Sequence, residues 1–363
     1  MCMIKVLHAA DLHLDSPFSG MTPEAAAARR REQRALPGRL VKLAKEKRCA
    51  LMLLAGDLFD SDNVFPETLE AMQEAFAAFS GRIFIAPGNH DACLPGSAYL
   101  TAQWPENVHI FKKRGVEKVF LPEYDLYVYG AGFESAHEAG LLEGFRAPDD
   151  GALRVMVLHG DPVNPDSGYN PIDRAQIEAS GLTYLALGHI HQASGLLRRG
   201  KTWYAWPGCA MGRGFDELGD KGAYIAALSP EEVRLEFVPL TERRYQIFRV
   251  PAGDDAAQAV AQALSQTKNT DICRVILTGE SGPVGLVQLH AQFSGRVFAL
   301  TLQDQTYPRR ALWQAAQEDT LRGVYLRMLK AQYDAETDES RRRVLALAAR
   351  LGLCAMEGRE MTP

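Results

Sequence analysis

The chain has 363 residues, which is long for one domain and comfortable for two, and its formal net charge is −5 at pH 7. With 47% apolar and 23% charged residues it is not a disordered protein, and no apolar run approaches the roughly 20 residues of a membrane span. A protein that holds nucleic acid by itself usually has a basic balance, because phosphate contacts dominate affinity. The acidic balance therefore confines any nucleic-acid contact to a local surface or to a partner, or indicates that the substrate is not a polymer.

The N-terminal residues lack the basic and long apolar regions of a signal peptide, and residues 3–10 have the pattern of a first strand that ends at Asp11-Leu12-His13. The six cysteines form no Cys-x-x-Cys pair, so reduced thiols are the simplest account and structural zinc is not expected. We therefore expect a cytoplasmic protein without membrane association.

The next elements alternate between helix and strand. Residues 23–48 have helical spacing, which Pro37-Gly38 is expected to divide into two helices, and Cys49–Ala55 is the continuous apolar run of a strand buried on both faces. A helix over about 66–80 leads into a strand over 82–86, which stops at Pro87-Gly88-Asn89-His90-Asp91. This alternation predicts an α/β sheet with helices on its faces.

Shorter elements follow. Strands are expected near 108–111, 117–121 and 125–130, and two later apolar runs, 154–158 and 184–187, end in His159-Gly160 and Gly188-His189-Ile190-His191. Residues 202–228 have the pattern of a β-hairpin, closed by the turn at 229–232.

Beyond that turn the sequence predicts a small α+β unit, with strands within 233–250, 272–278 and 296–302 and a helix over 254–266. From Pro308 to about residue 353 the chain is expected to be helical, with two apolar stripes. We therefore expect three parts, at residues 1–230, 231–306 and 307–363.

Five apolar runs end in small polar clusters: Asp11 with His13, Asp57, Asn89 with His90, His159, and His189 with His191. Five of the chain's nine histidines lie in these clusters. The C-terminal ends of strands in an open α/β sheet line one crevice, so we expect the clusters to converge. In extended backbone the i, i+2 spacing within two of the clusters puts both side chains on one face, as metal chelation requires.

The predicted ligands are imidazoles, two carboxylates and one amide oxygen. Because no thiolate takes part, this set favours Mn, Fe or Zn in a catalytic role over structural zinc. There are too many ligands for one ion, but two ions bridged by a carboxylate would accommodate them. Two ions about 3.5–4 Å apart can clamp a phosphoryl oxygen and generate hydroxide at neutral pH.

Each cluster taken alone has a simpler explanation. Residues 87–91 could be an ordinary turn, since Pro, Gly, Asn and Asp are all turn formers. A single histidine at a strand end is more often hydrogen-bonded without a chemical role. All five clusters together are hard to explain in this way.

The motifs Asp11-x-His13, Gly56-Asp57, Gly88-Asn89-His90-Asp91, His159-Gly160 and Gly188-His189-x-His191 resemble, complete and in order, those of the calcineurin-like metallophosphoesterases. More narrowly, residues 8–18 and Gly188–His191 resemble the SbcD-type DNA repair exonucleases, especially their YhaO-like branch. The resemblance is specific over residues 1–228 and weaker beyond. It implies an αββα sandwich of two mixed sheets flanked by helices, with a small α+β cap domain and C-terminal helices.

The resemblance also implies roles for the site residues. One metal ion would take Asp11, His13 and His191, and the other Asn89, His159 and His189, with Asp57 as the bridge. The two ions would be Mn2+, with Fe or Zn as alternatives. His90 would act on the phosphate as a general acid or stabilise the transition state, and Asp91 would orient the His90 ring. Asp15, Asp60 and Asp161 are expected to be solvated acids or partners of the ligands.

The leading functional hypothesis is a two-metal phosphodiesterase that acts on DNA ends as an exonuclease or endonuclease beside an SMC-like ATPase. A homodimer is a further expectation. Four basic clusters, beginning at Arg29, Lys112, Arg198 and Arg341, are either phosphate contacts or solvated faces. One rival hypothesis is a small-molecule or cyclic-nucleotide phosphodiesterase or a phosphatase. The other is a non-catalytic assembly subunit with structural metals.

Overall fold

The computed structural model describes residues 3–281, 284–308 and 310–356. Its contacts divide the chain into two compact units, Met1–Arg244 and Tyr245–Pro363. The boundary expected after residue 230 falls inside the first unit, because β12 (Val233–Pro239) pairs along its whole length with β11 (Gly222–Leu228). Residues 309 and 357–363 of the expected C-terminal helical part lie outside the described residues.

The first unit contains two mixed six-stranded sheets. The first has the order β12-β11-β1-β2-β3-β4, in which β1 to β4 are parallel and β11 is antiparallel to both its neighbours. The second has the order β5-β6-β7-β8-β10-β9, parallel from β6 to β10 and antiparallel at both edges. The remaining strands of the two sheets are β1 (Ile4–Ala9), β2 (Leu51–Leu54), β3 (Arg82–Ile85), β4 (Val108–Ile110), β5 (Glu117–Leu121), β6 (Leu126–Gly130), β7 (Leu153–His159), β8 (Tyr184–Gly188), β9 (Leu197–Arg199) and β10 (Thr202–Ala205).

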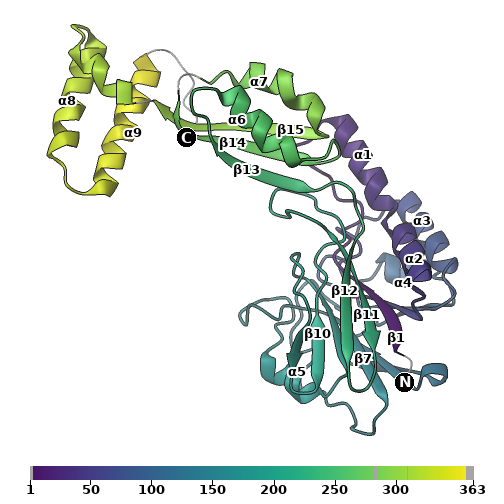
Figure 1. Cartoon of the computed structure of the whole chain (residues 1–363). Coiled ribbons are helices and arrows are strands. Elements are labelled where there is room, and N and C mark those ends of the chain that lie inside the picture. The colour runs from purple at the N-terminus through teal and green to yellow at the C-terminus, as the bar shows by residue number, and fades with distance from the viewer. Residues whose placement is uncertain (1–2, 282–283, 309, 357–363) are drawn as a thin grey trace. The chain divides into compact units, whose positions relative to one another are not determined.

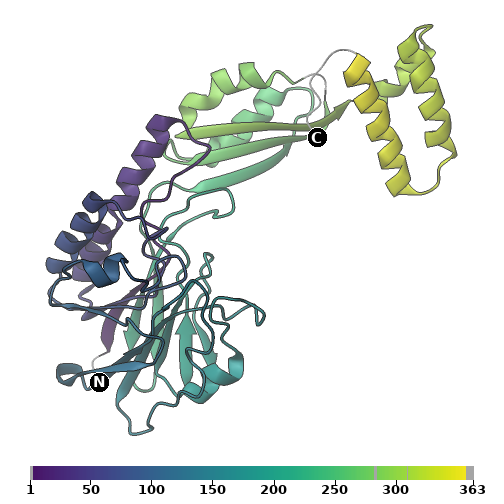
Figure 2. The same cartoon turned by 180° about the vertical axis from the view of Figure 1, so that it is seen from behind.

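The two sheets pack face to face between helices. Alternate side chains of a strand point to opposite faces, so Leu51 and Leu53 of β2 pack against the second sheet, whereas Met52 and Leu54 pack against helices. The helices on the outer face of the first sheet are α1 (Pro23–Arg34), α2 (Leu36–Lys47) and α3 (Pro66–Ala77) (Figures 1 and 2). The outer face of the second sheet packs against α5 (Arg174–Ser180). The expected αββα sandwich is therefore confirmed.

The break between α1 and α2 has a local cause. Thr22 caps α1, accepting the N–H of Ala25 on its hydroxyl at 3.3 Å. The helix ends at Ala35, and Pro37 lies in the first turn of α2, where its missing N–H costs no helical hydrogen bond. The two expected helices form, with the break slightly before Pro37.

A buried histidine joins the two sheets. His8 of β1 is fully buried, and its Nδ1 and Nε2 atoms lie 2.9 Å from Tyr184 Oη and from the carbonyl oxygen of Leu187 on β8. Burial lowers the pKa of His8 to about 3 although the hydrogen bond to Leu187 opposes the shift. His8 is therefore neutral at physiological pH and acts as a polar tie within an apolar interface.

The β-hairpin expected over 202–228 does not form. β10 pairs with β8 and β9 in the second sheet, whereas β11 pairs with β1 and β12 in the first. The turn at 229–232 instead joins β11 to β12, with the Ser229 N–H donating to the Glu232 carbonyl at 2.9 Å. Because the expected hairpin ends at this turn, the expected boundary precedes β12, whereas the first unit extends to Arg244.

The second unit begins with three parallel strands, β13 (Tyr245–Pro251), β14 (Ile272–Ser281) and β15 (Ala299–Pro308). The helices α6 (Ala256–Ala263) and α7 (Leu286–Phe293) connect them and pack on one face of the sheet (Figure 1). Helices and strands thus alternate in this small unit. The sequence pattern did not predict α7.

The last described elements are the 3-10 segment Arg310–Gln317, α8 (Leu321–Ala335) and α9 (Glu339–Met356). α8 and α9 pack on each other through Leu326 and Ala349, and the Tyr325 hydroxyl donates to the Ala348 carbonyl at 2.6 Å. Within the part of the chain that is described, no helix is long and apolar enough to cross a membrane.

Candidate metal centre

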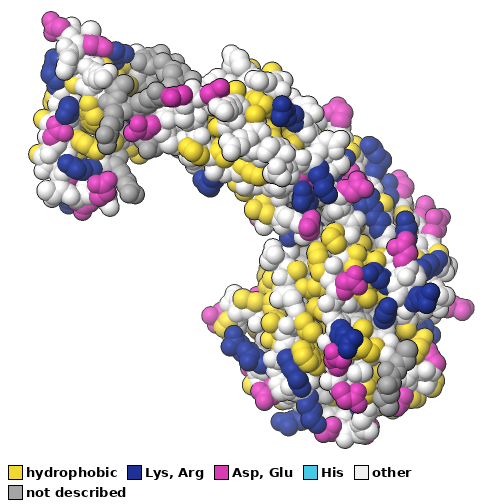
Figure 3. Space-filling model, in the orientation of Figure 1, with side chains coloured by type: hydrophobic (Ala, Val, Ile, Leu, Met, Phe, Trp, Pro, Cys, Tyr) yellow, Lys and Arg dark blue, Asp and Glu magenta, His cyan; other side chains and the backbone are white. Residues whose placement is uncertain are grey.

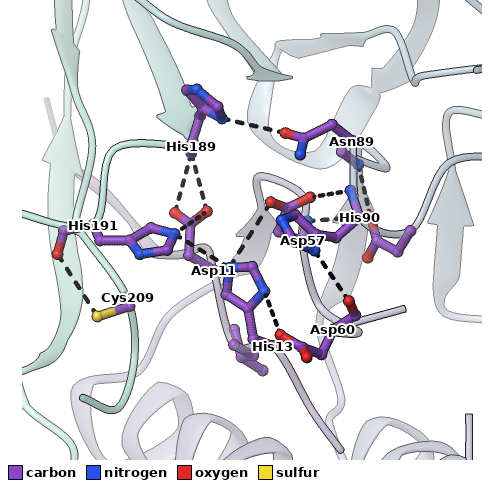
Figure 4. Close-up of polar contacts among 12 residues, drawn as sticks. Asp11, His13, Asp57, Asp60, Asn89, His90, His189, His191 and Cys209 are labelled. Carbon is purple, nitrogen blue, oxygen red and sulfur yellow. Dashed lines mark hydrogen bonds and ion pairs between the residues drawn. The ribbon is translucent and has the colours of Figure 1, made fainter. Parts of the chain in front are cut away.

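The five predicted clusters converge at one edge of the sandwich, and Figure 4 labels the members of four of them. The loops after β1, β2 and β3 carry the clusters of the first sheet, and the second sheet contributes the end of β7 and the loop after β8. Because these strands are parallel neighbours within their sheets, their C-terminal ends reach the same edge. The residues brought together are Asp11, His13, Asp57, Asn89, His90, His159, His189 and His191.

The backbone of the site differs from the extended geometry assumed from the i, i+2 spacing. Asp11, His13, Asp57 and His189 have φ values of 51°, 44°, 50° and 99°, in the left-handed region that non-glycine residues rarely adopt. Such conformations cost about 1–3 kcal/mol each and persist where surrounding structure enforces them. The residues paired by the i, i+2 spacing do lie together in the structure, but through left-handed and not extended backbone.

Asp11, His13 and His191 form the first ligand group. The Nε2 atoms of the two histidines lie 3.2 Å apart, and His191 Nε2 lies 3.9 Å from Asp11 Oδ1. Asp11 also accepts the backbone N–H of His189 on both carboxylate oxygens at 3.1 Å. Asp11 and His13 are fully buried, so the group is held by the protein and not by solvent.

The second ligand group contains Asp57, His159 and His189, with Asn89 beside them. Asp57 Oδ2 lies 3.4 Å from His159 Nε2 and 3.8 Å from His13 Nε2, so this carboxylate reaches both groups. Asn89 Oδ1 lies 2.9 Å from His159 Nε2 and 3.2 Å from His189 Nδ1. Asp57 is thus placed as a bridge requires.

The donor atoms in these groups fit a cation better than they fit one another. The Nδ1 atoms of His159 and His191 lie 2.9 Å from the carbonyl oxygen of Ala55 and 2.7 Å from a carboxylate oxygen of Glu217, groups that can only accept a hydrogen bond. Their protons are therefore on Nδ1, which leaves lone pairs on Nε2. The Nε2 atom of His191 lies 3.2 Å from His13 Nε2, and that of His159 lies 2.9 Å from Asn89 Oδ1. Two ligand atoms that are each about 2.1 Å from the same ion lie at a similar distance from each other.

Charge within the cluster shifts several pKa values. Burial would raise the pKa of Asp57, but positive charge on His159, His13 and His90 lowers it. Burial would lower the pKa of His159, but Asp57 and Asp11 raise it. The carboxylate of Asp57 is therefore the anionic centre of the site, as expected of a ligand shared between cations.

His90 is exposed at the mouth of the site, with its ring 4.8 Å from that of His13 in a T-shaped arrangement. Its Nδ1 atom lies 3.0 Å from the Asp60 carbonyl oxygen, so Nδ1 carries a proton and Nε2 is the atom left for substrate. His90 also lies close enough to His13 and Asp57 to share a cation with them. The position of His90 therefore suits either a contact with substrate or a share in cation binding.

The role predicted for Asp91 is wrong in the structure. Its carboxylate accepts the backbone N–H groups of Asp57, Leu58, Phe59 and Gly88 and the hydroxyl of Tyr99, at 2.6–3.2 Å, while the His90 ring is held by Asp60. Asp91 therefore fixes the loops that carry Asp57 and Asn89. A side chain buried to 3% exposure serves this purpose, and spacing alone could not distinguish it from an orienting acid.

Two residues near the site were missed by sequence reasoning. Glu217 accepts Nδ1–H of His191, and Arg213 bonds both Glu217 and Asp60. Both lie between β10 and β11, in a segment without a strand-end pattern, so no signal of that kind could have found them. Asp60 and Asp161 lie where expected, 3.2 Å from His13 Nδ1 and 3.7 Å from His189 Nε2, whereas Asp15 bonds Phe65 and Thr68.

Two glycines allow the loops to approach closely. A Cβ atom on Gly88 would lie 2.3 Å from Asp57 Oδ1, and one on Gly56 would lie 2.5 Å from His159 Nδ1. Gly56 also has φ +82°, which favours glycine. The glycines that precede Asp57 and Asn89 are therefore steric requirements of the centre.

Comparison with known proteins agrees with this geometry. The sequence pattern of the calcineurin-like phosphoesterases matches residues 4–193. The chain is 31% identical over 268 residues to a protein of Bacillus subtilis (strain 168) described as the uncharacterized metallophosphoesterase YhaO, a match that covers 70% of this chain and 63% of that protein. The chain therefore matches less than two thirds of that relative's length.

Two solved structures are similar at a lower level. A protein of Thermus thermophilus shares 12% identity with a TM-score of 0.40, covering 65% of this chain and 99% of that one. A dimetal phosphatase from Danio rerio shares 11% identity with a TM-score of 0.46, covering 67% of this chain and 98% of that one.

Proposed function

The chain belongs to the family of calcineurin-like phosphoesterases, metal-dependent hydrolases that bind two divalent ions, and we propose that it is a phosphodiesterase that cleaves DNA. The observation that carries the proposal is the convergence of two ligand groups around Asp57, with His90 exposed beside them. A non-catalytic subunit would need the ligands alone, whereas His90 is exposed and holds its Nδ1 against the Asp60 carbonyl oxygen, which leaves Nε2 for a substrate.

The residues of the centre have two roles in the proposed reaction, metal binding and proton transfer. Two divalent ions at the centre would withdraw charge from a phosphoryl group and lower the pKa of water. Asp57, Asp11, His13 and His159, which are buried, and Asn89, His189 and His191, which are part-buried, would hold the two ions. His90, oriented by its Nδ1 contact with Asp60, would present Nε2 to the leaving oxygen and deliver a proton or stabilise the transition state.

The DNA substrate is supported by the motif resemblance to SbcD-type exonucleases and by the second unit, for which a minimal phosphatase has no need. Surface charge gives limited support. Arg29 is fully buried and cannot contact phosphate, whereas Lys112, Lys113 and Arg114 are exposed. On the face shown in Figure 3, basic and acidic side chains are interspersed. Contacts with DNA would therefore be local, or shared with a partner.

An SMC-like ATPase is the proposed partner, and the helices α8 and α9 are the proposed docking segment. Leu326 and Ala349 are buried between them, whereas Leu321, Met328 and Val344 are 75%, 64% and 64% exposed. A helix pair that has satisfied its own packing and still exposes large apolar side chains suits helix-in-groove or coiled-coil association. The measurement is co-purification with the ATPase, which Leu321→Glu with Met328→Glu should abolish.

The remaining parts of the proposal are Mn2+ as the native metal, a homodimeric assembly and a cytoplasmic location. A ligand set of imidazole and oxygen without thiolate suits Mn2+, with Fe or Zn as alternatives. The five described cysteines are free thiols, which suits a reducing compartment. Metal analysis of the native protein tests the identity of the metal, and its sedimentation tests whether it is a dimer.

The decisive experiment compares substrates under one condition. The full chain with Mn2+ is incubated with end-labelled blunt, overhanging and hairpin DNA, and in parallel with bis(p-nitrophenyl) phosphate. We expect cleavage of both DNA and the small diester, with DNA products that reveal exonuclease or endonuclease action. Hydrolysis of the small ester alone would favour the small-molecule phosphodiesterase, and no hydrolysis with metals bound would favour an assembly subunit.

A further inference from the structure

Arg213 lies beside the first ligand group and contacts carboxylates on two different loops. Its Nη1 atom donates to Asp60 Oδ1 at 2.8 Å and its Nη2 atom to Glu217 Oε1 at 2.9 Å. Its backbone N–H donates to Glu217 Oε2 at 2.6 Å. The side chains of Arg213 and Glu217 are 22% and 3% exposed, so solvent screens these contacts little. A planar guanidinium can bond both acids at once, which makes Arg213 a fixed bridge between the loops.

Each of these acids faces the Nδ1 atom of a histidine in the first ligand group. Glu217 Oε1 accepts Nδ1–H of His191 at 2.7 Å, and Arg213 Nη2 itself lies 3.3 Å from His191 Nδ1. Asp60 Oδ1 lies 3.2 Å from His13 Nδ1, a close contact that is not aligned as a hydrogen bond. A carboxylate at Nδ1 keeps the proton on that nitrogen and leaves the lone pair on Nε2. The two Nε2 atoms are the ones that face each other across the first group.

The second ligand group is oriented by other partners. His159 Nδ1 donates to the Ala55 carbonyl at 2.9 Å, and His189 Nε2 lies 3.7 Å from Asp161 Oδ2. Because a backbone carbonyl carries no net charge, it raises the basicity of its histidine less than a carboxylate does. The two groups thus share Asp57 but are supported separately.

We propose that Arg213 is a positioning residue that sets the cation affinity of the first ligand group independently of the second. It does so by holding Glu217, which fixes the His191 ring with Nε2 toward the cation, and Asp60, whose carboxylate lies against His13 Nδ1. The inference rests on the proposed function, since it requires that the centre bind two divalent ions.

Loss of Arg213 would weaken the contact of Glu217 with His191 and that of Asp60 with His13. Glu217 is 3% exposed and accepts hydrogen bonds from His191 Nδ1, from Arg213 Nη2 and from the backbone N–H of Arg213. Without the guanidinium, Glu217 would be a buried carboxylate with one partner fewer, and Asp60 would be free to turn toward solvent. The imidazoles would then lose their fixed tautomer and orientation, while the backbone partner of His159 would remain.

The test measures Mn2+ binding to the metal-free full chain by calorimetry. We expect two sites in the wild-type protein, and in Arg213→Met one unchanged site and one weakened about 10–100-fold, the usual cost of losing an outer partner of a ligand. Glu217→Gln should weaken the same site, which keeps the inference testable if Arg213→Met fails to fold. The matched control is Arg154→Met, which breaks a 2.6 Å ion pair with Asp150 at the start of β7, the end away from His159, and should leave both sites unchanged.

A second readout separates positioning from general stabilisation. In the metal-free protein with ¹⁵N-labelled histidine, the wild type should show His13 and His191 protonated at Nδ1, and Arg213→Met should show mixed tautomers at those two rings only. Unchanged tautomers and two unchanged affinities in folded Arg213→Met and Glu217→Gln would overturn the inference. A wild-type protein that binds no Mn2+ would instead overturn the proposed function.

Discussion

The Nε2 atoms of His13 and His191 lie 3.2 Å apart although 178 residues separate them in sequence. One residue comes from the loop after β1 in the first sheet, and the other from the loop after β8 in the second. Two imidazole lone pairs repel each other at this distance unless a proton or a cation lies between them. Cation binding by this pair therefore depends on how the two sheets pack on each other. We expect substitutions that shift either sheet to change the metal content of the protein.

Removal of metal is the broadest prediction. Treatment with a chelator should abolish hydrolysis and lower the melting temperature, because ions bound by the folded state alone stabilise it by mass action. Asp57→Asn should have both effects without a chelator and should reduce Mn2+ binding at both sites, since this carboxylate reaches both ligand groups. Asp15→Asn removes a nearby acid whose carboxylate bonds Phe65 and Thr68, and it should leave the metal content unchanged. Two unaltered affinities in Asp57→Asn would contradict the bridging role.

A second prediction concerns His90. His90→Ala should lower kcat about 10²–10⁴-fold, the usual contribution of a positioned general acid, while both Mn2+ ions remain bound. The test is to measure both the metal content and the kcat of the purified variant. Loss of one ion would show that His90 is a ligand with His13 and Asp57, as their proximity allows.

The sequence predicted the αββα fold and the convergence of the strand-end residues because both depend on short-range patterns. Buried parallel strands are continuous apolar runs, and their C-terminal ends meet at one edge, so Asp57 and His159 could be assigned to one site before the structure was known. The hydrogen-bonding partners of the ligand residues could not be predicted in this way. Glu217 and Arg213 belong to a loop whose position depends on β10 and β11 lying in different sheets, and the apparent hairpin over 202–228 hid that fact.

Asp91 shows a second limit of prediction from sequence, which is that residues adjacent in sequence need not contact each other. Its place next to His90 in sequence suggested an orienting contact, but adjacent side chains in a loop commonly point apart. In the structure four backbone N–H groups and the Tyr99 hydroxyl converge on its carboxylate. Such a convergence depends on the tertiary fold, which sequence spacing does not contain.

A third prediction uses the close approach at Gly88. Gly88→Ala would place a Cβ atom 2.3 Å from Asp57 Oδ1 and 2.8 Å from the Asp57 backbone nitrogen, so the loop must shift. We expect loss of Mn2+ affinity and of activity, read by calorimetry and by hydrolysis of the small diester. Gly38→Ala is the matched control. Gly38 lies in α2, and apart from its chain neighbours and the adjacent helix backbone no described atom lies within 4 Å of the place that a methyl group would take. The change should raise the free energy of unfolding by about 0.5–1 kcal/mol at full activity.

The last prediction concerns acid stability and His8. The folded-state pKa of His8 is lowered to about 3 from the ordinary value of 6.5, so between these values the unfolded state binds the proton and the folded state does not. The free energy of unfolding must therefore fall as pH decreases from 6.5 toward 3, with a slope from this group of up to about 1.4 kcal/mol per pH unit. Above pH 6.5 His8 is neutral in both states and adds no slope.

The measurement is urea unfolding of the metal-free protein between pH 7 and pH 4.5, so that release of metal does not contribute. His8→Gln should be less stable than the wild type at pH 7, because the bonds to Tyr184 and Leu187 are disturbed, and the difference should shrink as the pH falls. His137→Gln, at an exposed position, should follow the wild-type curve. Parallel curves for the wild type and His8→Gln would show that His8 titrates normally, and would remove it as the acid-sensitive tie between the two sheets.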